Sequence, residues 1–210
     1  MDADAFWELI ERSGREAGTK DGRLAWLDGE LSRRSAEEIV GFQTWSTAVA
    51  NRGCTWDMYA AYWSVFGRGS TDGFEYFVYW LMGLGREAFE RVAECPDEVI
   101  ELPQVLHALK LRRTRLAARS SRIWSEEEYP EFELLAYVAF EPYEKVTGLD
   151  VEHLGDAVRA RGVRDKFPIA EIDFDGEAWD FDDVAEATRR FPRITHYWGS
   201  RTPPVPSGDR

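Results

Sequence analysis

The sequence lacks the features that would place it in a membrane or in a familiar catalytic class. It has no run of about eighteen apolar residues, so we expect no membrane-spanning helix. The motifs GxSxG, HExxH and GxGxxG and a phosphate-binding loop are also missing. The three histidines, His107, His153 and His196, are too scattered to form a metal-binding pair on one helix. We therefore expect no metal site and no cofactor, and no positive signal for an enzyme remains.

Cysteine is also scarce. Cys54 and Cys95 form neither a CxxC pair nor a cluster with histidine, whereas a secreted domain more often carries a larger paired set. The first residues, MDADAFWELIERSG, are acidic and amphipathic, and a secretory signal needs a basic start and an apolar stretch. We therefore expect a cytoplasmic protein with two ordinary buried thiols.

Acidic residues outnumber basic ones, and the net charge is −13. Such a charge repels a phosphate backbone, so we do not expect nucleic acid as a general partner. Residues 104–124 break this trend with six basic and no acidic residues. Four of these residues are candidates for contact with an acidic partner: Arg112, Arg113, Arg115 and Arg119. The partner would be an acidic peptide or, less in keeping with the net charge, nucleic acid. The alternative is a solvated helix face that neutralises the acidic body.

Apolar residues recur at three- and four-residue spacing along most of the 210 residues, which predicts a mainly α, compact multi-helix domain. We expect one domain over residues 1–198 and a flexible, proline-rich tail over 199–210. The alternation around Asp175 and Gly176 allows at most a small β-hairpin near residues 172–181. The expected helices are 4–17, 24–33, 35–53, 56–66, 72–81, 86–94, 104–124, 131–148 and 150–161.

Several helix starts carry capping signals. Ser35 with Glu38, Asp72 with Glu75, and Ser125 with Glu128 have the spacing of a capping box. Thr55 and Asp150 precede two further helices as N-caps. Pro142 falls inside the 131–148 stretch, where it should kink that helix or set its end.

The stretch between Trp56 and Trp80 carries ten aromatic residues in two helices joined by a glycine-rich loop. One stripe from each helix is enough to fill the contact between them, and this predicts a core of large side chains. The remaining aromatics allow a second interpretation, a groove for a peptide or small ligand. The residues that would line it are Trp56, Asp57, Tyr62, Asp72, Glu75, Tyr76, Trp80 and Arg86.

Six stretches in this order resemble a bacterial family catalogued as domain of unknown function 4240, common in actinobacteria: FWELIERS, SAEEIVGFQTW, the block from CTWDMYAAYW to GLGREAFERV, CPDEV, ELLAYVAFEPYEKVTG and RRFPRITHYW. The resemblance spans residues 1–198, and the central block is its most specific part. Family members usually show two adjacent acids before the Gly-Phe pair, where this chain has Thr71 and Asp72, so only the second acid carries over. The resemblance implies a helical cytoplasmic domain and supplies no activity.

Two classes of function stay open. The first is a non-enzymatic binding or accessory protein that recognises a peptide or protein partner through the aromatic groove. The second is an enzyme of unrecognised class that acts on a small molecule or peptide at the aromatic and acidic cluster between Trp56 and Arg86, for example within a biosynthetic cluster. The oligomeric state is not indicated by the sequence.

Overall fold

A computed structural model describes residues 1–67, 69–167 and 172–200. Regular structure in this part of the chain is helical and contains no β-strand, which confirms the mainly α prediction. The residues beyond 200, which make up most of the predicted flexible tail, lie outside the described part. The elements are α1 (Ala3–Glu16), α2 (Lys20–Leu31), α3 (Ala36–Gly53), α4 (Trp56–Phe66), α5 (Thr71–Gly83), α6 (Arg86–Glu94), the 3-10 helix η1 (Pro96–Glu101), α7 (Pro103–Ala117), the 3-10 helix η2 (Glu133–Leu135), α8 (Phe140–Thr147), α9 (Val151–Ala160), α10 (Val184–Arg190) and α11 (Pro192–Gly199).

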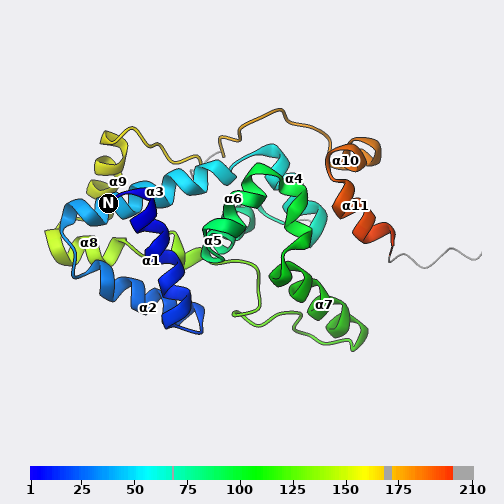
Figure 1. Cartoon of the computed structure of the whole chain (residues 1–210), viewed down its shortest axis with the longest axis horizontal. Helices are drawn as coiled ribbons and strands as arrows, with labels where there is room; N and C mark the ends of the chain where they lie inside the picture. The colour runs from blue at the N-terminus through cyan, green and yellow to red at the C-terminus, as the bar shows by residue number, and fades with distance from the viewer. Residues whose placement is uncertain (68, 168–171, 201–210) are drawn as a thin grey trace, which may run out of the picture.

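The helices are arranged along the long axis of the molecule. In Figure 1, α2, α8 and α9 lie at one end, α4, α5 and α6 in the middle, and α10 and α11 at the other end. The long connection from α9 to α10 crosses between the two ends. The C-terminal helices are therefore far from α9, which precedes them in sequence.

The core is built largely from aromatic side chains. Five phenylalanines from four helices are less than 2% exposed: Phe6, Phe42, Phe74, Phe77 and Phe89. Helices α4 and α5 pack on each other as predicted, with ring centroids 5.0 Å apart for Tyr59 and Phe74 and 5.1 Å apart for Tyr62 and Phe77. Each buried ring removes about 150–250 Å² from water, so these contacts are a large share of the core.

Most of the predicted capping residues cap their helices. Ser35 and Glu38 form both hydrogen bonds of the capping box at the start of α3. The side chains of Thr55 and Asp150 accept backbone N–H groups of α4 and α9. The Asp150 carboxylate also lies 2.8 Å from the ring Nδ1 of His153, so the capping residue and the histidine interact locally.

At α5 the predicted cap was wrong. The N-cap is Ser70, whose Oγ accepts the N–H of Gly73 at 3.0 Å. The helix therefore begins at Thr71, and Asp72 lies inside its first turn. Because Ser70 already satisfies the free amide, the carboxylate of Asp72 remains exposed and available for another contact.

Two helices are shorter than the sequence pattern predicted. In the basic segment α7 ends at Ala117, and Arg119 adopts a left-handed backbone with φ of 52°. In the 131–148 stretch, η2 and a turn precede α8, and Pro142 is the third residue of that helix. Proline is tolerated there because the first amides of a helix have no intrahelical acceptor.

The third predicted capping box holds a turn instead of a helix. Ser125 donates its backbone N–H to Glu128 at 2.8 Å, and Glu128 donates back to the Ser125 hydroxyl at 3.4 Å. Pro130 follows, and the residues around it form turns and bends. The local hydrogen bonds were therefore predictable, although no helix extends from them.

The hairpin considered for residues 172–181 does not form. These described residues contain no strand, and an isolated parallel bridge joins Asp175 to Thr55. The rings of Phe174 and Phe181 instead pack against the aromatic side chains of α4. The alternation of apolar and polar residues thus belongs to an extended segment that lies on a helix.

Replacement of the observed cap should destabilise the protein more than replacement of the predicted one. We expect Ser70→Ala to lower the free energy of unfolding by about 1 kcal/mol, because one amide at the start of α5 loses its acceptor. Asp72→Ala should have a smaller effect, and urea unfolding of both variants measures the difference. An equal or larger loss in Asp72→Ala would show that Asp72 holds the helix start.

Candidate functional site

The outer aromatic face of α4 is covered by the C-terminal part of the chain. The rings of Trp56 and Phe174 stack with centroids 4.4 Å apart, and Tyr59 lies 5.3 Å from the same phenylalanine ring. Phe181 approaches Trp63 edge-on at 5.9 Å. Trp56 is consequently half-buried by the protein's own residues.

Two other candidates for the groove lie in the core. Tyr62 is 5% exposed and Trp80 is 9% exposed, and both pack against Phe77. Burial raises the pKa of the Tyr62 hydroxyl well above its usual range. Neighbouring core side chains cover both residues, so neither offers a surface to a ligand in this structure.

Asp57 joins α4 to the C-terminal helices. One of its carboxylate oxygens accepts the indole N–H of Trp179 at 3.0 Å and an N–H of the Arg190 guanidinium at 2.9 Å. The Arg190 guanidinium also lies over the Trp179 ring at 5.2 Å. These contacts give Asp57 a structural role in holding the covering segment.

Arg86 begins α6, and the free amides of a helix start can favour an anionic group. Its backbone N–H donates to the carboxylate of Glu11 at 3.2 Å, so a residue of α1 supplies that anion. The guanidinium donates to Asp4 at 2.7 Å and to Glu90 at 3.0 Å. This arrangement ties α1 to α6 at the surface.

The remaining candidates, Asp72, Glu75 and Tyr76, lie together on one face of α5. The spacing of positions 72, 75, 76 and 79 places these side chains and Tyr79 along a single stripe of the helix. Residues of the 133–137 segment and of the loop before Phe167 meet this stripe. We call the group the acid–tyrosine cluster: Asp72, Glu75, Tyr76, Tyr79, Glu133, Tyr137 and Asp165.

Backbone contacts hold the segments of the acid–tyrosine cluster in place. The N–H of Phe132 donates to the carbonyl of Tyr76 at 2.9 Å, which places the following residue, Glu133, within hydrogen-bonding distance of the Tyr76 side chain. Asn51 at the end of α3 donates to the carbonyl of Arg164 at 2.7 Å, next to Asp165. The Tyr79 hydroxyl is hydrogen-bonded to Ser46 of α3. Three separate parts of the chain are therefore fixed around one stripe of α5.

The acid–tyrosine cluster has an exposed rim and a buried floor. Asp72, Glu133 and Asp165 are exposed, and Tyr137 is 40% exposed. Other members lie deeper, since Glu75 and Tyr76 are half-buried and Tyr79 is buried. Glu75 and Tyr76 therefore keep part of their surface in solvent, beside the exposed carboxylates.

Glu75 has the most perturbed carboxyl group in this cluster. Burial, followed by the charges of Asp165, Asp72 and Glu133, raises its pKa to about 7. Burial, followed by the hydrogen bond to Glu133, also raises the pKa of Tyr76. Burial and the nearby carboxylates likewise raise the pKa of Tyr79. Each raised pKa means that the ionised form of the group is disfavoured in this cluster. A cation bound beside these groups would therefore be stabilising.

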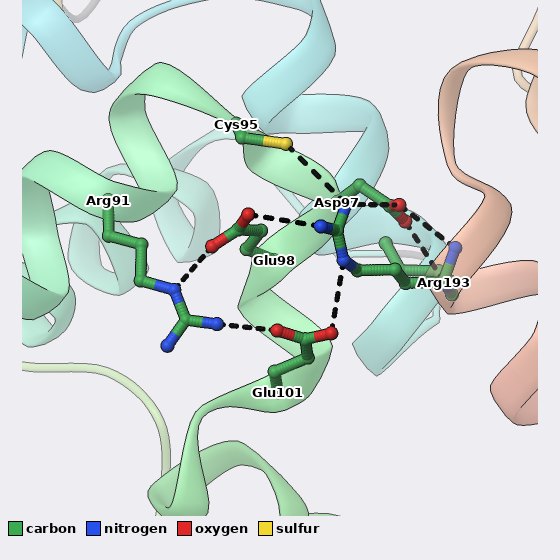
Figure 2. Close-up of polar contacts among 7 residues, drawn as sticks. Arg91, Cys95, Asp97, Glu98, Glu101 and Arg193 are labelled. Atoms are coloured by element: carbon green, nitrogen blue, oxygen red, sulfur yellow. Dashed lines mark hydrogen bonds and ion pairs between the residues drawn. The ribbon is translucent and has the colours of Figure 1, made fainter.

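A second polar cluster joins η1 to α11 (Figure 2). The buried carboxylate of Asp97 accepts the backbone N–H groups of Arg193 at 2.9 Å and Ile194 at 3.0 Å, and so caps α11 from another element. The Arg193 side chain pairs with Glu98 and Glu101 at 3.2 and 3.0 Å. This network attaches the C-terminal helix to the body.

The four arginines proposed for partner binding have different surroundings. Arg115 forms a bidentate pair with Glu128, and Arg112 donates to the carbonyl of Phe66 at 2.9 Å. Arg113 and Arg119 are exposed. The side chain of neither arginine forms a hydrogen bond or ion pair with another residue of the described part of the chain. Two of the four are therefore available for a partner.

Neither thiol belongs to a cluster with metal-ligand geometry. Within residues 1–67, 69–167 and 172–200 no group of three or more potential ligands is placed to hold a metal ion. Burial raises the pKa of the Cys54 thiol to about 12, so it stays protonated, and Cys95 is half-buried. No helix among the described residues is both long and apolar enough to cross a bilayer.

The fold and the acid–tyrosine cluster together define an all-α protein with a polar, carboxylate-rich surface site. The sequence model of the family described as protein of unknown function (DUF4240) matches residues 1–145, and the chain belongs to this family. The match ends at residue 145, before the RRFPRITHYW stretch. The resemblance of that stretch to the family is therefore not tested by the match. Comparison with curated proteins and with solved structures gives no match.

Sequence reasoning named three members of the acid–tyrosine cluster and missed the other four. The α5 spacing already places Tyr79 on the stripe of Asp72 and Glu75, so helical periodicity could have identified it. Glu133 and Tyr137 were four residues apart in an expected helix, but nothing in the pattern joined that helix to α5. Asp165 lies in a loop whose position depends on the contact between Asn51 and the loop backbone.

The cap on α11 makes a stability prediction. Asp97→Ala should lower the free energy of unfolding by about 2–3 kcal/mol, because two backbone amides lose a buried charged acceptor. Amide hydrogen exchange should show that residues 192–199 lose protection first. Glu98→Ala is the control and should cost less, since its ion pairs are closer to solvent and are screened by it. Equal losses in the two variants would contradict the capping role.

The raised pKa of Glu75 makes a second prediction. The folded protein loses stability as pH rises from the ordinary glutamate pKa of 4.5 to about 7, because Glu75 must ionise where it is partly buried and beside other carboxylates. Glu75→Gln should therefore be more stable than the wild type at about pH 8, by on the order of 1 kcal/mol after solvent screening, and this gain should vanish near pH 4.5. Thermal unfolding across this range measures it. Glu87→Gln, an exposed change on α6, should show no such trend.

Proposed function

We propose that this protein is a binding or accessory protein that recognises a cationic side chain of a peptide or protein partner at the acid–tyrosine cluster. The supporting observation is Glu75, a half-buried carboxylate surrounded by further acids. None of the four carboxylates, Asp72, Glu75, Glu133 and Asp165, forms an ion pair with another described residue. The proposal keeps the expected cytoplasmic, bacterial setting.

The charges of the cluster favour an ammonium or guanidinium group. Burial and then repulsion between the carboxylates raise the pKa of Glu75, and a cation placed among them would relieve the repulsion. Carboxylates near Glu75 come from α5, from the start of η2 and from the loop before Phe167, so they surround a cation from several directions. A cation that contacts several carboxylates is held more strongly than a cation that pairs with one isolated surface acid.

The tyrosines add a second attraction for the same kind of ligand. Tyr76, Tyr79 and Tyr137 lie beside the carboxylates, and an aromatic face attracts a cation within about 6 Å of its centroid. The exposed rim formed by Glu133 and Tyr137 leaves room for the peptide that carries the side chain. The aromatic contribution predicted from the sequence thus moves from the Trp56 face of α4 to the tyrosines around α5.

Binding of a lysine probe tests this proposal. The probe is Nα-acetyl-lysine methylamide, titrated into the 15N-labelled protein and followed by NMR chemical-shift changes. We expect a millimolar Kd, equivalent to about −4 kcal/mol, and shifts centred on Glu75 and Tyr79. Affinity should increase between about pH 6 and pH 8, because Glu75 ionises while the lysine stays charged.

Matched variants separate a specific site from general attraction to an acidic protein. Glu75→Gln should weaken binding about ten-fold at pH 8, whereas Glu87→Gln removes the same charge on α6 and should leave the Kd unchanged. The Nε-acetylated probe has no charge and should not bind. Equal effects of the two variants, or binding of the acetylated probe, would rule out recognition at this cluster.

An enzyme remains the second candidate, supported by the same carboxyl group. A general base works best when its pKa lies near the working pH, and the pKa of Glu75 is about 7. An enzyme would chemically change a bound amine-containing probe, and mass spectrometry would detect the product. Loss of that product in Glu75→Gln, with probe binding retained, would favour the enzyme over the binding protein.

A further inference from the structure

A groove lies between α7 and the last turn of α11, at the end of the molecule opposite α9 (Figure 1). Its volume is 550 Å³, within the range of ligand-binding clefts. Helix α7 contributes one wall, α11 contributes Tyr197 and Trp198, and the end of α4 closes the floor. It shares no residue with the acid–tyrosine cluster.

The α7 wall is a regular helical stripe. Leu109, Arg112, Arg113 and Leu116 line the groove at positions i, i+3, i+4 and i+7. Leu109 is buried, whereas Leu116 is 52% exposed. Beyond Leu109 no residue of α7 is buried, so the second half of this helix extends past the body. A large apolar side chain is thus presented to solvent beside two arginines.

The opposite wall is aromatic and held in position. Trp198 is 40% exposed, and its indole N–H donates to the carbonyl of Ser64 at 3.1 Å. Asp97 caps the helix that carries it. This wall is therefore preformed, and a partner would not have to order it on binding.

The groove differs in charge from the rest of the chain. The segment 104–124 has six basic residues and no acidic ones, in a protein with a net charge of −13. The Arg112 guanidinium is positioned by the carbonyl of Phe66, and Arg113 is exposed without an ion pair among the described residues. An acidic partner would be repelled by most of the surface and attracted here.

We propose that this groove binds an acidic amphipathic helix of a partner protein. Its apolar side chains would lie between Leu116 and Trp198, and its carboxylates would face Arg112 and Arg113. A helix laid into a groove between two helices is a common mode of peptide recognition. The concave shape favours a helix over a flat anionic membrane, and the net charge disfavours nucleic acid.

A designed peptide tests the proposal on the full-length protein. The probe is a fluorescein-labelled amphipathic helix of leucine and glutamate, about 16 residues long so that it can form a helix in water. Fluorescence anisotropy at about 0.1 M salt should give a micromolar Kd. Arg113→Glu should weaken binding at least ten-fold, and Leu116→Ser several-fold. Both side chains are exposed, so circular dichroism should show that each variant folds normally.

The matched control reverses a charge on the same helix. Lys110 is exposed on α7 and is not among the described residues that line the groove, so Lys110→Glu should change the Kd by less than three-fold. If Lys110→Glu lost as much peptide affinity as Arg113→Glu, the effect would be general electrostatics, and the proposal would be overturned. Equal binding of a leucine–lysine peptide would overturn it as well.

Two other occupants are tested with the same variants. Binding to vesicles of anionic phosphatidylglycerol, without binding to the leucine–glutamate peptide, would identify a membrane surface and overturn the proposal. A dimer in sedimentation velocity that Leu116→Ser dissociates would identify a second copy of the chain in the groove and would also overturn the proposal. A monomer that binds the acidic peptide and ignores the vesicles supports the proposal.

Discussion

The structure depends on covering the aromatic side chains that α4 and α5 carry on several faces. One stripe from each helix closes their mutual contact through Tyr59, Tyr62, Phe74 and Phe77. The other faces would expose large apolar rings to water, and each buried ring removes about 150–250 Å² of surface from solvent. The chain meets this requirement with its C-terminal part, which crosses the molecule and places Phe174 and Phe181 on α4. The caps and ion pairs at Asp57 and Asp97 then hold this covering segment in place.

This covering also decides where polar chemistry can occur. Once the rings of α4 are packed, the accessible face near the aromatic block is the stripe of α5 that carries Asp72, Glu75 and Tyr76. Around it the fold gathers more carboxylates, and burial, followed by these charges, raises the pKa of Glu75 to about 7. At the other end, the docking of α11 beside α7 creates a basic, apolar groove. The two surfaces have opposite charge and lie on different elements, so they suit different groups of a partner or different partners.

Local chemistry explains which parts of the fold could be predicted. The Ser35 capping box and the Thr55 and Asp150 caps form where the sequence placed them, because a cap is a contact within four residues. At α5 the capping-box spacing pointed to Asp72, whereas the structure has Ser70 as the cap. The alternation near Asp175 was mistaken for a possible hairpin because an extended segment on a helix also alternates. Of the proposed ligand residues, Tyr62 and Trp80 could not be assigned to core or surface until the neighbouring elements were known.

The sequence by itself determined the helical class, most helix starts, the acidic character and the basic segment at 104–124, because these follow from composition and from short-range spacing. The tertiary structure decided which aromatic residues are covered, which carboxylates meet at Glu75, and which arginines stay unpaired. Such outcomes depend on contacts between residues far apart in the chain, such as Asp57 with Arg190 and Asp97 with the start of α11. Periodicity places a side chain on a face of its own helix, whereas only packing determines what that face meets.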